Sequence, residues 1–111
     1  MISYLPAPDE TIWVGVLRLS LQIPGARSLK DRRRVVLSMR DRIHARHHAA
    51  FAEVGHLDAA GAAVVAISVI GNDSRLVRSR LDTIRNDVLN TADALLVDHH
   101  TTVVNHRTLL G

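Results

Sequence analysis

The residues of this chain best suited to binding a charged partner are cationic side chains gathered in one segment. Residues 27–46 contain eight Lys or Arg and two Asp, so their formal charge is +6, whereas the whole chain carries +3. Guanidinium and ammonium groups donate charge-assisted hydrogen bonds to phosphate oxygens, and clustered positive charge attracts a polyanion. The residues that we expect to contact nucleic-acid phosphates are Arg27, Lys30, Arg33, Arg34 and Arg40.

A second interpretation of the same segment is a helix face that is simply solvated. Arginine is a good helix former, and Asp31 could pair with Arg34 three residues later. The segment would then have a structural role and no polyanionic partner. Both interpretations require that most of these side chains lie away from the core.

The turn at residues 24–30 is a second candidate for anion binding. Free backbone N–H groups at a helix N-terminus, with Arg27 and Lys30 beside them, can bind an anion. The alternative is a tight turn in which Ser28 caps the helix. Neither glycine-rich nucleotide-binding pattern, GxGxxG or GxxxxGKS/T, is present in the sequence.

The seven histidines raise the question of a metal site. Two adjacent pairs occur, one at residues 47–48 and one at residues 99–100, and neighbouring residues on a strand point to opposite faces. Neither pair is therefore suited to chelation, and the helical zinc pattern HExxH is absent. We expect no metal and no cofactor.

Glu53, His56 and Asp58 are the candidates for acid–base catalysis. In a regular strand Glu53 lies on the opposite face from His56, and no motif places a nucleophile nearby. We expect a structural role for Glu53 and a protein that is not an enzyme. A small hydrolase or metal-dependent enzyme is the alternative for these three residues.

Hydrophobic periodicity predicts the elements that position these side chains. Apolar runs and alternation predict four strands, at residues 12–23, 49–56, 62–70 and 94–104. A first helix begins after Ser28, and a second presents one apolar face, formed by Val77, Leu81, Ile84 and Val88. The order β-α-β-β-α-β predicts a ferredoxin-like α+β sandwich, with two helices on one face of a four-stranded antiparallel sheet. We divide the chain into an N-terminal arm at 1–11, this domain at 12–105 and a C-terminal tail at 106–111.

The sheet face away from the helices is predicted to be apolar at its centre. The residues that form this centre are Val14, Val16, Val64 and Ala66. A face of an antiparallel sheet that meets water normally carries polar residues, so we expect it to be covered. The cover is either the N-terminal arm, through Tyr4 and Leu5, or a second copy in a homodimer. Because the chain has one Trp, one Tyr and one Phe, stacking of bases on this sheet is disfavoured.

Length and composition narrow the class of protein. A chain of 111 residues with 47 % hydrophobic residues fits one globular domain. The absence of cysteine excludes disulfides and thiol chemistry. The first residues lack the pattern of a signal peptide, and the apolar stretch at 59–70 is too short to cross a bilayer. We expect a cytoplasmic protein with no membrane partner.

Three segments carry a resemblance to a known family. They are VGVLRLSLQIPGARSLKDRRRVV at 14–36, AEVGH at 52–56 followed by Asp58, and VIGND at 69–73. In these segments the chain resembles the YlxP-like family of small bacterial proteins of unknown function, over about residues 12–104. The resemblance implies a ferredoxin-like fold without an assigned activity or catalytic residues. Relatives tend to be encoded near transcription-termination, translation-initiation and ribosome-maturation factors, which implies work on RNA or the ribosome.

Two functions follow from these observations. We expect a non-enzymatic protein that binds the backbone of structured or ribosomal RNA through its basic first helix. The alternative is a homodimeric interaction or regulatory module that uses the apolar sheet face and has no nucleic-acid role.

Overall fold

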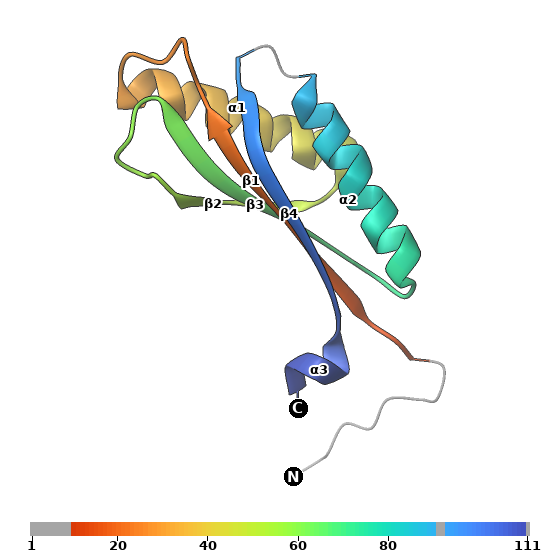
Figure 1. Ribbon diagram of the computed structural model, residues 1–111. Coiled ribbons are helices and arrows are strands. Elements are labelled where there is room, and N and C mark those ends of the chain that lie inside the picture. Colours follow the sequence, from red (N-terminus) through yellow and green to blue (C-terminus); the bar gives the residue numbers. More distant parts are fainter. Residues whose placement is uncertain (1–9, 91–92, 111) are drawn as a thin grey trace.

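The structure is a computed structural model that describes residues 10–90 and 93–110 (Figure 1). Residues 1–9 of the expected arm, with Tyr4 and Leu5, lie outside the described residues. The elements are β1 (Trp13–Gln22), α1 (Leu29–His47), β2 (Ala50–Gly55), β3 (Ala62–Gly71), α2 (Ser74–Leu89), β4 (Leu95–Asn105) and α3 (His106–Leu110). This order confirms the predicted α+β sandwich, and the predicted bounds of the strands differ from the observed ones by at most one residue at each end.

The sheet is antiparallel throughout, in the order β2-β3-β1-β4. β1 and β3 form its centre, and their register places Leu17 opposite Ile67. Both long helices lie on the same face of this sheet (Figure 1). Because side chains alternate along a strand, the odd-numbered residues of β1 face the helices and the even-numbered residues face away.

The core lies between the sheet and the two long helices. Its strand side comes from the odd-numbered positions of β1 and β3, where Leu17, Leu19, Val65 and Ile67 are fully buried. The buried stripes of the helices are Val36, Met39 and Ile43 on α1, and Val77, Leu81, Ile84 and Val88 on α2. The apolar spacing on α2 therefore predicted its buried face correctly, since residues three and four apart share one side of a helix.

Side-chain caps start both long helices. The Ser28 Oγ accepts a hydrogen bond of 3.1 Å from the Asp31 N–H, which confirms Ser28 as the N-cap of α1. The Asp31 carboxylate accepts in return from the Arg27 N–H at 3.2 Å, one residue before the position that a capping box uses. The entry to α1 is thus a tight capped turn. At α2 the Asp73 carboxylate accepts from two backbone N–H groups in the same way.

Arg32 corrects the predicted arrangement of α1, because it lies inward with the apolar stripe and is only 3 % exposed. Its guanidinium pairs with the Glu53 carboxylate on β2. It also donates to the Ala62 carbonyl at 2.8 Å and to the His56 carbonyl at 2.9 Å. From the sequence, most of the cations in residues 27–46 were expected to lie away from the core, and Arg32 does not. Here Arg32 instead joins α1 to both ends of the β2–β3 connection.

The segment after residue 105, expected to be a tail, contains the short helix α3. The His106 N–H donates to the Ile12 carbonyl at 2.8 Å, so the start of α3 is attached to the chain just before β1. Among the described residues no helix combines the length and the apolar character needed to cross a membrane.

Candidate nucleic-acid interface

The packing of α1 on the sheet determines which of its side chains form the outer face. Val36, Met39 and Ile43 point into the core, so side chains on the opposite side of the helix point to solvent. Lys30, Arg33, Arg34, Leu37, Asp41 and His44 occupy that side and are exposed. Arg27 is exposed in the turn that leads into the helix. The fold therefore places four of the five predicted phosphate contacts together, around the N-terminal half of α1.

Half of the cations in residues 27–46 form ion pairs with carboxylates of the same chain. Arg32 pairs with Glu53, and both Arg42 and Arg46 pair with Asp87 on α2. The fifth predicted contact, Arg40, pairs with its neighbour Asp41 at 3.0 Å. Because that pair is exposed to solvent, it contributes little to stability and Arg40 keeps access to a partner.

The other four cations have no counter-charge among the described residues. Within residues 10–90 and 93–110, Arg27, Lys30, Arg33 and Arg34 form no ion pair, and their side chains form no hydrogen bond. The pair expected in the solvated-helix interpretation, between Asp31 and Arg34, is not formed, because the Asp31 carboxylate accepts from the turn instead. These four residues are hereafter the cationic patch.

Asp87 explains why the C-terminal half of α1 presents less unpaired positive charge to solvent than the N-terminal half. Its carboxylate accepts from Arg42 Nη2 at 2.5 Å and lies 2.8 Å from His47 Nε2, with Arg46 at 3.4 Å. Burial raises the pKa of Asp87, but the hydrogen bonds from Arg42 and His47 and the nearby arginine charges outweigh burial, so its pKa lies below the ordinary value of 3.8. The cluster joins α1 to α2.

Asp87→Asn is expected to destabilise the protein at neutral pH and progressively less in acid. A depressed pKa in the folded state gives stabilisation that is present above the ordinary pKa and is lost as the pH falls through the folded value. Urea unfolding of both proteins between about pH 6 and about pH 2 measures this. The difference in unfolding free energy should shrink below the ordinary Asp value of 3.8. A difference that stays constant into acid contradicts the assignment.

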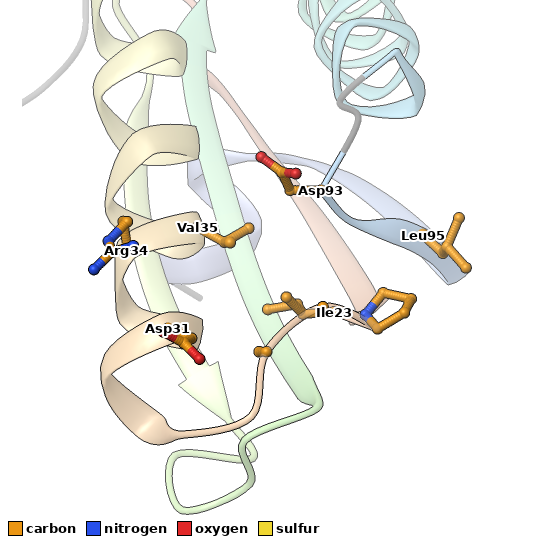
Figure 2. A pocket seen from close by; sticks show the side chains of 9 residues that line it. Ile23, Asp31, Arg34, Val35, Asp93 and Leu95 are labelled. Carbon is orange, nitrogen blue, oxygen red and sulfur yellow. The ribbon is translucent and has the colours of Figure 1, made fainter.

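A hollow of about 530 Å³ lies next to the cationic patch, between the N-terminal half of α1, the turn after β1 and the start of β4 (Figure 2). Figure 2 shows Val35 on the side of α1 that faces the hollow, and Arg34 on the outer side of the helix. Asp31 and Asp93 supply two carboxylates to the lining. No group of three metal-ligating side chains occurs in the part of the chain that the structure describes.

The sheet face away from the helices contains the four residues predicted for it, but they differ in accessibility. Val16 is exposed, and Val14 and Ala66 are partly covered, whereas Val64 is 6 % exposed and is packed beside Gly55. Ile70, at 65 % exposure, adds a larger apolar side chain. The two aromatic residues within the sheet, Trp13 and Phe51, pack against the core on the other face. They are not available there for stacking with bases.

Two of the predicted acid–base candidates, Glu53 and His56, contact the same arginine, Arg32. The Glu53 carboxylate faces α1 and is held by Arg32. His56 contributes its backbone carbonyl to the same arginine and adopts a positive φ of 55°. Of the paired histidines, His47 contacts Asp87, while His99 and His100 are exposed on alternate faces of β4. Glu53 therefore has a structural contact, as expected from the sequence.

Sequence reasoning missed two residues that organise this side of the molecule. Asp87 gathers cations from α1, and Arg80 on α2 donates to the His47 carbonyl at 3.0 Å. Their partners are 33 to 45 residues away in the chain. No local pattern indicates such pairs.

Fold and surface together define a small α+β sandwich with a cationic first helix. Within that class, the chain belongs to the family described as protein of unknown function (DUF503), whose model matches residues 14–101. A comparison with curated proteins found no match. Among solved structures, the chain is similar to the de novo designed protein Foldit4, with 10 % identity and a TM-score of 0.46. That alignment covers 85 % of this chain and 94 % of the designed one.

Proposed function

We propose that this protein binds the phosphate backbone of structured RNA through the outer face of α1, and that it is not an enzyme. The observation that carries the proposal is the cationic patch, in which four exposed cations have no counter-charge among the described residues. An uncompensated cluster gains more from phosphate than paired arginines do, because no internal ion pair has to be broken first.

Two further features support contact with the backbone rather than with bases. The patch is on an exposed helix, and the deep, narrow major groove of an A-form RNA helix does not admit side chains to the base edges, so phosphates are the accessible partners. The aromatic residues within the sheet face the core, so the stacking platform of sheet-based RNA readers is missing from the described strands. The resemblance to the YlxP-like family, whose relatives are encoded near translation and ribosome-maturation factors, also favours a ribosomal RNA.

Arg33→Glu combined with Arg34→Glu is expected to weaken binding of a structured RNA hairpin by at least about tenfold. Four phosphate contacts predict a slope of log affinity against log salt of about −3 to −4, and the double variant should lower its magnitude by about 2. Fluorescence anisotropy over a range of salt concentrations measures both quantities. Affinity should depend little on the sequence of the hairpin.

The matched control is Arg75→Glu combined with Arg78→Glu on α2. Both arginines are exposed, their side chains form no ion pair among the described residues, and the change in net charge is the same. We expect this control to keep most of the affinity. Equal losses in the two double variants would mean that only net charge matters and would falsify the assignment to α1.

The apolar sheet face favours homodimerisation as a second candidate function. Val16 and Ile70 expose apolar surface there, while Arg18 and Asp98 form an ion pair at 3.7 Å on the side toward β4. A second copy placed face to face would cover the apolar centre. Light scattering over a range of protein concentrations, with Val16→Glu as the disrupting variant, separates this candidate from RNA binding. A monomer at every concentration contradicts it.

A further inference from the structure

A second hollow, of about 340 Å³, lies where the C-terminal end of α1 meets α2. Four of its lining residues are cationic or can become so, and two carry hydroxyl groups. The lining consists of Arg46, His47, His48, Ser79, Arg80 and Thr83. This hollow is separate from the cationic patch, because Arg34 and Arg46 are twelve residues apart, or about 18 Å along a helix.

Arg80 is fixed in place by the backbone. Its Nη2 donates to the His47 carbonyl at 3.0 Å, and its Nη1 lies 3.5 Å from the Ile70 carbonyl. A guanidinium has five N–H groups, so these contacts leave the Nε–H and one N–H on each terminal nitrogen. The bond to His47 also covers a carbonyl at the negative end of α1, which otherwise disfavours an anion. Arg80 therefore lines the hollow with N–H groups to spare and with its side chain already held by the backbone.

The nearest carboxylate does not neutralise this donor. Asp87 makes its shortest contacts with Arg42 and His47, and its contact with Arg46 is longer, at 3.4 Å. Arg46 is 60 % exposed, so its side chain can also reach the hollow. Among the described residues, Arg80 forms no ion pair. The cluster thus has three arginines and one carboxylate, which leaves two positive charges before the histidines are counted.

The hydroxyl groups are arranged to complement these charges. The Thr83 hydroxyl donates to the Ser79 carbonyl at 3.0 Å, within the helix. The Ser79 hydroxyl forms no hydrogen bond in the part of the chain that the structure describes, so it is available as a neutral donor beside Arg80. A charged fork with an adjacent hydroxyl is suited to tetrahedral oxyanions.

We propose that this hollow binds a phosphate group, held by Arg80 and Arg46 with the Ser79 hydroxyl. The phosphate comes either from a phosphorylated small molecule or from an RNA backbone, and the recognition chemistry is shared. The proposal does not depend on the cationic patch, since none of the patch residues lines this hollow.

The test is a titration of the full chain with inorganic phosphate, followed by amide chemical shifts at constant ionic strength. We expect saturable shifts at residues 79–83 and 46–48. Arg80→Gln should weaken binding at least about tenfold, because it removes the fixed donor. Arg78→Gln is the matched control: it is exposed on the same helix, loses the same charge and lies outside the hollow, so affinity should be unchanged.

Ser79→Asp tests the proposal without removing an arginine that contacts the backbone. The added carboxylate should occupy the donors and abolish the phosphate-dependent shifts, while the spectrum otherwise stays that of the folded protein. Non-saturable shifts in the wild type, or equal losses in Arg80→Gln and Arg78→Gln, overturn the proposal.

Two further ligands distinguish the source of the phosphate. If a nucleoside monophosphate binds the hollow and Arg80→Gln leaves affinity for an RNA hairpin intact, the site takes a phosphorylated small molecule. If the hairpin displaces inorganic phosphate and Arg80→Gln weakens hairpin binding, the site takes the RNA backbone. Loss of hairpin binding in the Arg33 and Arg34 double variant, with phosphate binding retained, separates this site from the proposed function.

Discussion

Glu53→Ala is expected to lower the free energy of unfolding by about 3 kcal/mol. The change leaves the Arg32 guanidinium buried beneath α1 without its counter-charge, and loss of one partner of a buried pair costs about 3–5 kcal/mol. We expect a loss at the lower end of this range because the Glu53 side chain is 25 % exposed, so in the variant water can partly replace the carboxylate beside Arg32. Urea denaturation at neutral pH measures the change.

A double variant shows whether the cost comes from the unpaired charge. Arg32→Met together with Glu53→Leu removes both charges and keeps the volume, and it should recover much of the stability lost in Glu53→Ala. Recovery should be incomplete, because the Ala62 and His56 carbonyls lose the donors that Arg32 supplies. A double variant less stable than Glu53→Ala contradicts the argument.

Leu81→Ala is expected to lower the free energy of unfolding by about 2–5 kcal/mol. Leu81 is fully buried at the centre of the α2 stripe, where the helix packs on β1. Truncation removes apolar contacts and leaves a cavity. Leu76→Ala, on the exposed side of the same helix, should change the value by less than about 0.5 kcal/mol. Similar losses in the two variants would mean that α2 does not pack as described.

Gly15 on β1 provides an independent check of the same contact. A Cβ at this position would lie 2.5 Å from Val77 Cγ1 and 2.7 Å from Leu81 Cδ1, so Gly15→Ala alone should cost about 1–3 kcal/mol through overpacking. In the Leu81→Ala background part of that space is empty, and Gly15→Ala should cost less. The two changes should therefore be non-additive in a double-mutant cycle.

Local patterns were sufficient to predict the four strands, the two long helices and the buried face of α2. Ser28 as a candidate cap indicated the start of α1, and the spacing of Val77, Leu81 and Ile84 indicated the inner side of α2. Each of these signals depends on residues within a few positions of one another. The β-α-β-β-α-β order then restricts how the elements can be connected.

The use of individual charges could not be predicted in this way. Arg32 falls on the inner side of α1 because its acceptors, on β2, in the β2–β3 connection and at the start of β3, are supplied by residues more than 20 positions later. Arg42 is withdrawn from the outer surface by Asp87, which is 45 residues away. A count of cations along the helix therefore overstates the charge available to a partner. The five residues of α3 are too few to show a periodic pattern.

Pairing of β1 with β4 has a consequence for the order in which the protein folds. The register pairs Trp13 with Asn105, and the His106 N–H donates to the carbonyl of Ile12, the residue before β1. These contacts join residues that are among the most widely separated in the sequence. During synthesis β1 can pair with β3 early, but its other edge stays open until β4 has left the ribosome. Contacts of such long range slow folding, and the nascent chain carries an unpaired strand edge in the interval.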